Sequence, residues 1–324
     1  MTAKVAISRA VFPETLALLA AHFQVRDNQE DRALDGEALA QLLADRDGAL
    51  LTLTDRVDDA LLDRCPQLKA VCNIAVGYNN IDVPACTRRG ILVTNTPGVL
   101  DESTADFAWA LMLGAARRLS EAERYVRKGL WQRWELRQML GFDVHHATLG
   151  IIGLGRIGQA VARRASGFAM RVIYHNRRPV DSGIEQQCNA TYSTMEDLLR
   201  TADFVVVTVP YGPATHHLLG AAELELMKPT AVLVNVSRGG VVDDAALARA
   251  LQARRLGAAG LDVFENEPKL DPALLALDNV VLTPHIASAS EATRRKMADT
   301  AARNLVAALS AQRPPNLVNP EALP

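Results

Sequence analysis

The sequence has few cysteines, no long apolar run and little net charge. Four cysteines in 324 residues, without C-x-x-C spacing, are too few for a disulfide scaffold. No apolar run is long enough to span a bilayer, and the N-terminus does not resemble a signal peptide. A net charge of −2 gives no electrostatic footprint for nucleic acid. We therefore expect a cytoplasmic protein that binds neither membranes nor nucleic acids.

The remaining composition is that of an ordinary globular protein. It is 49% hydrophobic and 22% charged, and its length indicates two domains. Cys65, Cys72 and Cys86 lie near one another in the sequence, which leaves a metal site open. Buried thiols are the simpler interpretation, and we expect no metal.

A glycine-rich motif gives the first indication of function. Residues 148–152 are apolar and β-prone, the next six are Gly-Leu-Gly-Arg-Ile-Gly, and helix formers follow to residue 167. Strand, G-x-G-x-x-G and helix in this order are typical of a dinucleotide site, although glycines also serve ordinary turns. In such a site Gly153 allows a tight turn, Gly155 the approach of a pyrophosphate, and Gly158 close packing of helix on strand.

The residues after the glycines indicate which dinucleotide to expect. The phosphates would bind backbone N–H groups at the start of the helix, at Arg156 and Ile157. An NAD site has an acidic residue about 20 positions beyond the glycines, but Asn176, Arg177 and Arg178 occupy that window. The two arginines suit a 2′-phosphate, unless they are only solvated turn residues. NADP(H) is therefore the expected cofactor, with NAD(H) as the alternative.

The order of expected strands and helices predicts an α/β fold with two Rossmann-like domains, each built on a parallel sheet. Strands alternate with helices both before and after the glycine motif, as in βαβ units. We assign residues 1–99 and 288–324 to a substrate-binding domain, into which a dinucleotide-binding domain, residues 100–287, is inserted. The expected strands are residues 4–7, 48–52, 68–74, 148–152, 170–174, 204–209, 231–236, 258–263 and 280–283.

Residues 101–119 are expected to form one long helix. Its apolar residues cover more than one face, which predicts burial between domains or subunits. The charged segment 124–137 follows and contains Trp131 and Trp134. We interpret this segment as a surface arm or flap in which both tryptophans are packed.

Three residues that could carry chemistry stand at or just after expected strand ends: Arg238, Glu267 and His285. The carboxyl ends of parallel strands meet at the edge where such folds bind ligands. Hydride delivery to a ketone leaves a negative oxygen, which an imidazolium can stabilise and protonate. A carboxylate favours the charged ring, and an arginine can bind a substrate carboxylate through two parallel bonds. Each residue also has an ordinary alternative, such as an ion pair between Arg238 and Asp243.

The loop after the expected strand 68–74 is a candidate anion site. Its Gly77, next to Val76, allows backbone N–H groups to point at a carboxylate. A plain Gly-Asn turn is an equally good interpretation of the same residues.

Together these motifs resemble those of the D-isomer-specific 2-hydroxyacid dehydrogenases over nearly the whole chain. The resemblance is carried by Val76–Gly77, Gly153–Gly158, Asn235–Asp243, Gly260–Pro268 and Pro284–His285. It implies that Arg238 binds the substrate carboxylate and carbonyl, His285 donates the proton and Glu267 orients His285. It also implies that backbone N–H groups of Val76 and Gly77 bind the carboxylate. The other residues that it places at the cofactor are Thr104, Val209, Pro210, Val236, Ser237 and Asp262, the last at the nicotinamide amide.

Asp143-Val144-His145-His146 resembles the branch of glyoxylate/hydroxypyruvate and 2-ketogluconate reductases, whose use of NADPH agrees with Arg177 and Arg178. The resemblance further implies a homodimer with the long helix and the arm at its interface. We therefore expect an NADPH-dependent reductase of glyoxylate, hydroxypyruvate or 2-ketogluconate. Two alternatives stay open: an NAD-dependent D-2-hydroxyacid dehydrogenase for another substrate, and a corepressor-like protein that only senses the dinucleotide.

Overall fold

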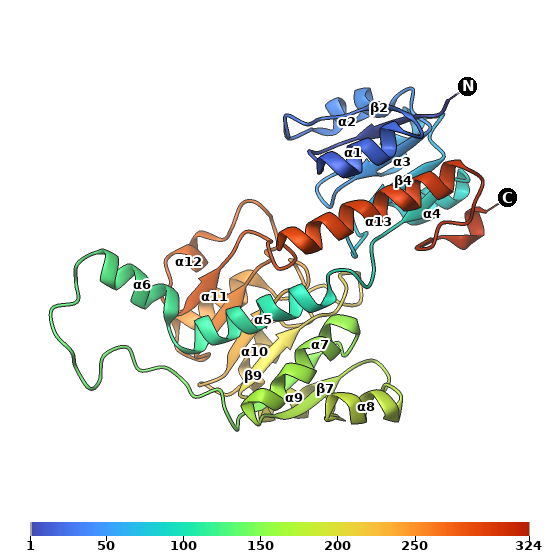
Figure 1. Ribbon diagram of the computed structural model, residues 1–324. Coiled ribbons are helices and arrows are strands. Elements are labelled where there is room, and N and C mark those ends of the chain that lie inside the picture. The colour runs from blue at the N-terminus through green and yellow to red at the C-terminus, as the bar shows by residue number, and fades with distance from the viewer. Residues whose placement is uncertain (1, 324) are drawn as a thin grey trace. The chain divides into compact units, whose positions relative to one another are not determined.

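The computed structural model describes residues 2–323 and confirms an α/β fold with two parallel sheets. The chain divides into two compact units, Met1–Leu100 with Ala289–Pro324, and Asp101–Ser288 (Figure 1). The second unit is therefore inserted into the chain of the first. No helix among the described residues is long and apolar enough to cross a membrane.

The first unit is a five-stranded sheet in the order β2-β1-β3-β4-β5. On one face α1 and α13 pack over Val5 and Ile7, and on the other α2, α3 and α4 pack over Ala6. Adjacent residues of one strand thus enter two different cores, which is why the strands read as continuous apolar runs. The strands are β1 (Lys4–Ile7), β2 (Gln24–Arg26), β3 (Gly48–Leu51), β4 (Ala70–Asn73) and β5 (Leu92–Thr94). The helices are α1 (Pro13–Ala20), α2 (Gly36–Leu43), α3 (Asp59–Asp63), α4 (Val83–Arg88), α13 (Glu291–Leu309) and the 3₁₀ turn η2 (Pro320–Ala322).

The second unit is a seven-stranded sheet in the order β12-β11-β10-β9-β6-β7-β8. The strand before the glycine motif, β6, pairs with β7 on one side and β9 on the other, so the strand order reverses there. Doubly wound sheets bind nucleotides at this reversal. The strands are β6 (Thr148–Ile152), β7 (Arg171–His175), β8 (Ala190–Tyr192), β9 (Phe204–Val207), β10 (Val232–Asn235), β11 (Ala258–Leu261) and β12 (Val280–Leu282).

Helices cover both faces of this second sheet. α5, α7 and α8 pack on one face, and α9, α10, α11 and α12 pack on the other. The helices are α5 (Asp101–Ala116), α6 (Leu119–Arg127), α7 (Arg156–Ala165), η1 (Ser166–Phe168), α8 (Ser182–Cys188), α9 (Met195–Thr201), α10 (Ala221–Leu226), α11 (Asp244–Gln252) and α12 (Pro272–Leu275).

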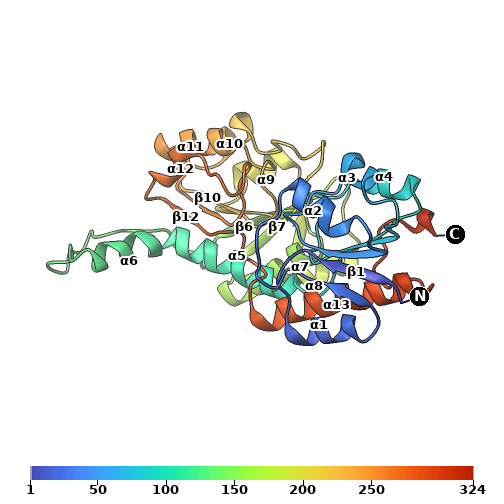
Figure 2. The same ribbon diagram turned by 90° about the horizontal axis from the view of Figure 1, so that it is seen from above.

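The region after α5 differs from expectation. α5 ends at Ala116, because Arg118 takes the left-handed conformation (φ +54°) and a separate helix, α6, begins at Leu119. α6 and the loop after it extend away from the sheet of their own unit in both views (Figures 1 and 2). Trp131 and Trp134 are 55% and 73% exposed, so the expectation that both are packed is wrong within a single chain.

All four cysteines are buried thiols, as expected. Burial raises the pKa of Cys72 and of Cys86 to about 12. Neither is therefore a thiolate at neutral pH, the form that binds metals.

Candidate active site

The glycine loop joins β6 to α7 at the reversal of the strand order, and two of its glycines are required by close contacts. Gly153 has a φ of +102°, and a Cβ there would lie 2.8 Å from Cγ1 of Val209. A Cβ on Gly158 would lie 2.3 Å from the carbonyl oxygen of Gly153. A Cβ on Gly155 would meet nothing within 4 Å, because this position faces open space. The loop is thus tight at both ends and leaves room for a ligand at its middle glycine.

The amino end of α7 offers backbone donors to a ligand. Its N-cap is Gly155, no side chain caps it, and Arg156 and Ile157 are its first residues. Asp, Thr or Ser side chains cap α2, α3, α4, α9, α11, α12 and α13, whereas α1, α6 and α8 share the lack of a side-chain cap with α7. Uncapped N–H groups at a helix start bind phosphate well, so this loop fits the pyrophosphate of a dinucleotide.

The residues after β7 flank the glycine loop. Asn176 accepts a hydrogen bond at Oδ1 from the backbone N of Leu154, 2.7 Å away. Arg177 and Arg178 are exposed, and neither forms an ion pair with another described residue. Residues 175–180 include no acidic side chain. The positive charge that follows β7 therefore remains available to an anion.

Tyr174 holds this turn in place, a role not predicted from the sequence. Its hydroxyl accepts a hydrogen bond from the backbone N of Val180 (2.9 Å) and donates one to Oε1 of Glu185 (2.7 Å). Burial, together with the hydrogen bond to Glu185, raises the pKa of Tyr174 to about 12. The phenol is therefore protonated at neutral pH and can make both bonds.

The end of β10 fixes the backbone around Arg238. Asn235 accepts hydrogen bonds at Oδ1 from the backbone N (3.0 Å) and Oγ (2.6 Å) of Ser237. Nη1 of Arg238 donates to the carbonyl oxygen of Ser237 at 2.7 Å. Burial lowers the pKa of Arg238, whereas the charge of Glu267 raises it. The guanidinium is still charged at neutral pH, because its ordinary pKa exceeds 12.

His285 and Glu267 form a direct pair. Nδ1 of His285 lies 2.8 Å from Oε2 of Glu267, and Oε1 of Glu267 accepts from the backbone N of Phe264 at 2.9 Å. Burial would raise the pKa of Glu267, but its hydrogen bond with His285, the Phe264 amide and the charge of Arg238 together lower it. The structure thus brings the three residues predicted from strand ends into one electrostatic group in the second unit.

Asp262 anchors the segment that carries His285. Its carboxylate accepts hydrogen bonds from the backbone N atoms of Ile286 (2.8 Å) and Ala287 (2.7 Å) and from Oγ1 of Thr283 (2.7 Å). These contacts hold His285 in a left-handed conformation (φ +56°) that is unfavourable for a residue with a side chain. This positioning role was not predicted from the sequence. The one sequence feature that could have indicated it is the position of an aspartate at a strand end next to the expected site.

Gly239 allows the segment after Arg238 to approach the segment before Glu267. A Cβ on Gly239 would lie 1.7 Å from the carbonyl oxygen of Phe264, so no other residue fits there. The sequence shows two glycines after Arg238 but not what they contact.

The remaining residues predicted at the cofactor belong to the same unit. Val209 and Pro210 lie in the loop after β9, and Val236 and Ser237 follow β10. Thr104, on α5, and Asp262 are only 4% and 0% exposed. Contact with a cofactor would require both to become accessible, so their cofactor contacts stay predictions.

Val76 and Gly77 follow β4 in the first unit, and their carbonyls are held by asparagines. Asn73 donates from Nδ2 to the carbonyl oxygen of Gly77 (2.9 Å), and Asn95 donates to that of Val76 (2.8 Å). Neither backbone N–H of the two residues donates to another described residue. The asparagines thus orient these peptides, and the backbone N–H groups of both residues remain available as donors, which is compatible with the predicted anion site.

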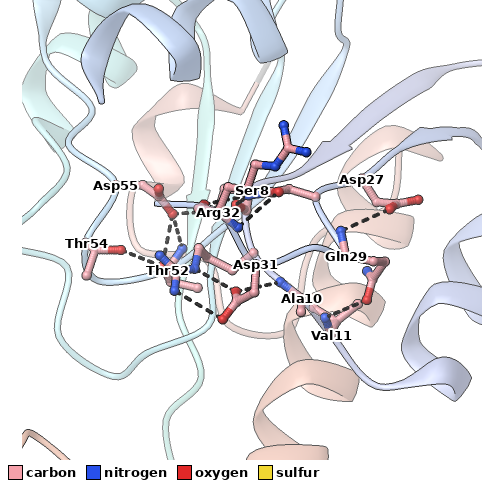
Figure 3. A network of polar contacts seen from close by, with 12 residues as sticks. Ser8, Ala10, Val11, Asp27, Gln29, Asp31, Arg32, Thr52, Thr54 and Asp55 are labelled. Atoms are coloured by element: carbon pink, nitrogen blue, oxygen red, sulfur yellow. Dashed lines mark hydrogen bonds and ion pairs between the residues drawn. The ribbon is translucent and has the colours of Figure 1, made fainter. Parts of the chain in front are cut away.

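A polar network next to this loop was not predicted. Buried Asp55 accepts hydrogen bonds from Oγ of Ser8 (2.5 Å) and from the backbone N of Thr52 (2.7 Å; Figure 3). Asn80 donates to the carbonyl oxygens of Thr52 and Asp55, and its own Oδ1 accepts from Asn73. The loops after β1, β3 and β4 are therefore joined at one edge of the sheet.

Comparison with known proteins identifies the family. Residues 109–287 match the family model described as D-isomer specific 2-hydroxyacid dehydrogenase, NAD binding domain. The chain belongs to the D-isomer-specific 2-hydroxyacid dehydrogenases. This 2-hydroxyacid dehydrogenase is 47% identical over 327 residues to a glyoxylate reductase of Thermococcus gammatolerans, covering 100% of the chain and 98% of the relative.

Two solved structures are similar over almost their whole length. The NADPH-dependent glyoxylate/hydroxypyruvate reductase of Sinorhizobium meliloti, in complex with NADP and malonate, has a TM-score of 0.89 and 36% identity, and the match covers 100% of this dehydrogenase and 98% of that chain. A protein of Thermus thermophilus has a TM-score of 0.90 and 41% identity, with 97% and 99% covered. The resemblance seen in the sequence is confirmed, including the glyoxylate reductase branch. This dehydrogenase is an NAD(P)-dependent oxidoreductase that acts on CH–OH groups and reduces 2-ketoacids.

Proposed function

We propose that this dehydrogenase uses NADPH to reduce glyoxylate, hydroxypyruvate and 2-ketogluconate to D-2-hydroxyacids, with His285 as the proton donor. The observation that carries the proposal is the 2.8 Å contact between His285 and Glu267 beside Arg238. The name of the S. meliloti neighbour, an NADPH-dependent glyoxylate/hydroxypyruvate reductase, supports the same substrates and cofactor.

The proposed reaction assigns one role to each charged residue. Bound NADPH supplies the hydride, which leaves negative charge on the former ketone oxygen. His285, as imidazolium, stabilises this oxygen and transfers a proton to it from Nε2. Glu267 contacts Nδ1, which orients the ring. Arg238 binds the substrate carboxylate, with backbone N–H groups of Val76 and Gly77 as further donors.

The choice of NADPH rests on the residues after β7. A 2′-phosphate needs cationic donors, and Arg177 and Arg178 are exposed and without ion-pair partners among the described residues. An acidic residue that would accept the ribose hydroxyl of NAD is absent from residues 175–180. Tyr174 and Asn176 fix this turn against the glycine loop.

A second copy of the chain is the proposed partner. Seven of the eleven large apolar side chains that are exposed among the described residues lie between Leu119 and Leu140. A cavity of about 390 Å³ beside them is lined by Phe107, Leu111 and Val281 together with polar residues of α6. So large an apolar surface on one arm is typical of a subunit interface. We therefore propose a homodimer that forms through α5, α6 and the arm.

An assay of NADPH oxidation tests the proposed function. The panel contains glyoxylate, hydroxypyruvate, 2-ketogluconate, pyruvate and phenylpyruvate, each repeated with NADH. We expect the highest kcat/KM with NADPH and one of the first three acids. A preference for NADH with another acid would replace this function with that of an NAD-dependent dehydrogenase. Binding of NADPH without turnover of any acid would indicate a cofactor sensor.

A further inference from the structure

Three side chains that the proposed reaction does not use converge on the surface of the second unit. A ring nitrogen of His216, a ring nitrogen of His217 and a carboxylate oxygen of Glu265 all lie within 4.8 Å of one another. The two imidazoles are stacked, with centroids 4.0 Å apart. Among the described residues no other set of three such donors converges in this way. We propose that these residues bind a divalent transition-metal ion of the zinc class.

The donor types determine the class of metal. Two imidazole nitrogens and one carboxylate oxygen are a ligand set that Zn²⁺ uses in proteins, with solvent at the remaining position. Calcium and magnesium prefer sites made of oxygen alone, which this is not. Imidazole also binds Cu²⁺ and Ni²⁺, so this ligand set accepts transition-metal ions as a class and does not distinguish zinc from them.

The spacing of the donors suits an ion. Nε2 of His217 lies 3.0 Å from Oε1 of Glu265. Two ligands at about 2.0–2.2 Å from a tetrahedral ion lie roughly 3.3–3.6 Å apart, so this pair needs to separate by only a few tenths of an ångström. The ring nitrogen of His216 lies within 4.8 Å of the other two donor atoms, and His216 is exposed, so its side chain is not confined by packing.

An outer hydrogen bond orients one of the imidazoles, and a carboxylate lies near the other. The hydroxyl of Tyr211 lies 3.2 Å from Nδ1 of His216, which leaves Nε2 of that ring for the ion. Nδ1 of His217 lies 4.0 Å from Oδ2 of Asp243, on the side opposite Glu265. In metal sites, a hydrogen-bonded outer partner such as the Tyr211 hydroxyl helps to orient the ring. A simple ion pair between His217 and Glu265 would need neither His216 nor Tyr211.

The ion would connect two segments next to the candidate active site. His216 and His217 belong to the segment after β9, and Glu265 stands two residues before Glu267. The backbone N of His217 donates to the carbonyl oxygen of Gly240 at 2.7 Å. A metal site here joins these segments across the Gly239–Gly240 turn, independently of which ketoacid is reduced.

Calorimetric titration of the untagged, chelator-treated protein with Zn²⁺ tests the proposal. We expect one Zn²⁺ per chain and no heat of binding with Mg²⁺. His216→Ala and Glu265→Gln should each weaken the affinity at least about tenfold, and Tyr211→Phe by about as much. His145→Ala is the matched control, since His145 and His146 are also adjacent but have no third donor converging on them. It should leave the affinity unchanged.

Co²⁺ provides a second readout that reports the ligands directly. Its visible absorption in the wild-type protein should show a four- or five-coordinate ion and should be lost in His216→Ala, with circular dichroism confirming that the variant is folded. Absence of a Zn²⁺ equivalent, or equal affinity in wild type, His216→Ala and Glu265→Gln, would overturn the proposal.

Discussion

At the scale of single residues, the candidate site is an arrangement of charges around a carboxylate, Glu267, whose neighbours favour its ionised form. Glu267 stays negative despite burial, because His285, the Phe264 amide and Arg238 all lower its pKa. A carboxylate that is reliably ionised is what a histidine needs in order to act as an acid near neutral pH. Asp243 and Asp244, the two carboxylates next to Arg238 in the sequence, accept hydrogen bonds from the backbone N atoms of Ala246 and Glu265.

Glu267→Gln tests the carboxylate. Glutamine keeps an oxygen for the backbone N of Phe264 but presents no negative charge to His285. We expect kcat for 2-ketoacid reduction to fall about tenfold or more, while the KM for NADPH changes little. Steady-state kinetics at a fixed, saturating ketoacid concentration measure both, and an unchanged kcat would show that the pair is only structural.

Arg177→Ala combined with Arg178→Ala tests the choice of cofactor. Removal of two cations from a 2′-phosphate should raise the KM for NADPH at least about tenfold, because hydrogen bonds to charged groups contribute about 1.5–3 kcal/mol each. The KM for NADH should change less than about twofold. Arg171→Ala with Arg249→Ala is the control, since these arginines are also exposed and lie elsewhere in the same unit. Equal effects on both cofactors would mean that Arg177 and Arg178 do not contact the phosphate.

At the scale of elements, the residues of the candidate site follow the carboxyl ends of the strands, and polar side chains at the amino ends connect neighbouring elements of the sheet. Asp203 precedes β9, and its carboxylate accepts from the backbone N of Thr148 (2.9 Å) and from Nζ of Lys228 (2.8 Å). Burial would raise the pKa of Asp203, but these two donors lower it below its ordinary value of 3.8. The native state therefore gains stability from the ionised form.

Asp203→Asn tests this contribution through its pH dependence. Because the folded pKa lies below the unfolded value, the stabilisation is full above pH 3.8 and disappears as the pH falls through the folded pKa. We expect the variant to be less stable by about 1 kcal/mol at pH 7, a modest value because the ion pair is about one-third exposed. Urea unfolding from pH 7 to pH 3 should show the two proteins converging in acid, and a constant difference would contradict this interpretation.

The elements that the sequence predicts well are those with long apolar patterns. β6, β9 and β10 are buried on both faces, so their apolar runs are unmistakable. β2, β5 and β8 have only three residues each, and none of them is predicted. β12 is equally short but is predicted, because its residues are all apolar and Pro284 follows soon after. The break at Arg118 is also invisible, because an arginine carries no sign of a left-handed conformation.

The same limit applies to the site. Glycine spacing and strand ends suffice to select Gly153, Arg238, Glu267 and His285, since their residue types have few other uses in that order. The anchoring role of Asp262 depends on backbone N–H groups more than 20 positions away in the sequence. Such contacts follow from the folded geometry of two loops and leave no local pattern.

At the scale of the whole molecule, the exposed arm is the least explained part of a single chain. Trp134 and Leu136 are 73% and 77% exposed on a segment that extends away from its own sheet (Figures 1 and 2). Burial of each of these two side chains in a homodimer would contribute about 1.5–3 kcal/mol to the free energy of association.

Trp134→Asp combined with Leu136→Asp tests the proposed dimer. Light scattering after size exclusion should give twice the chain mass for the wild type and the mass of one chain for the variant. Leu275→Asp is the control, because Leu275 is 62% exposed but lies on α12, outside the arm. A monomeric wild type would refute the proposal, as would a variant that remains dimeric.

The most direct test of the proposed mechanism is kcat of His285→Ala with NADPH and whichever 2-ketoacid the wild type reduces best. We expect kcat to fall about 10²- to 10⁴-fold, as for the loss of a general acid. The dissociation constant of NADPH, from fluorescence titration, should stay within about twofold of the wild type. Turnover near the wild-type rate, with NADPH still bound, would contradict the assignment of His285 as the proton donor.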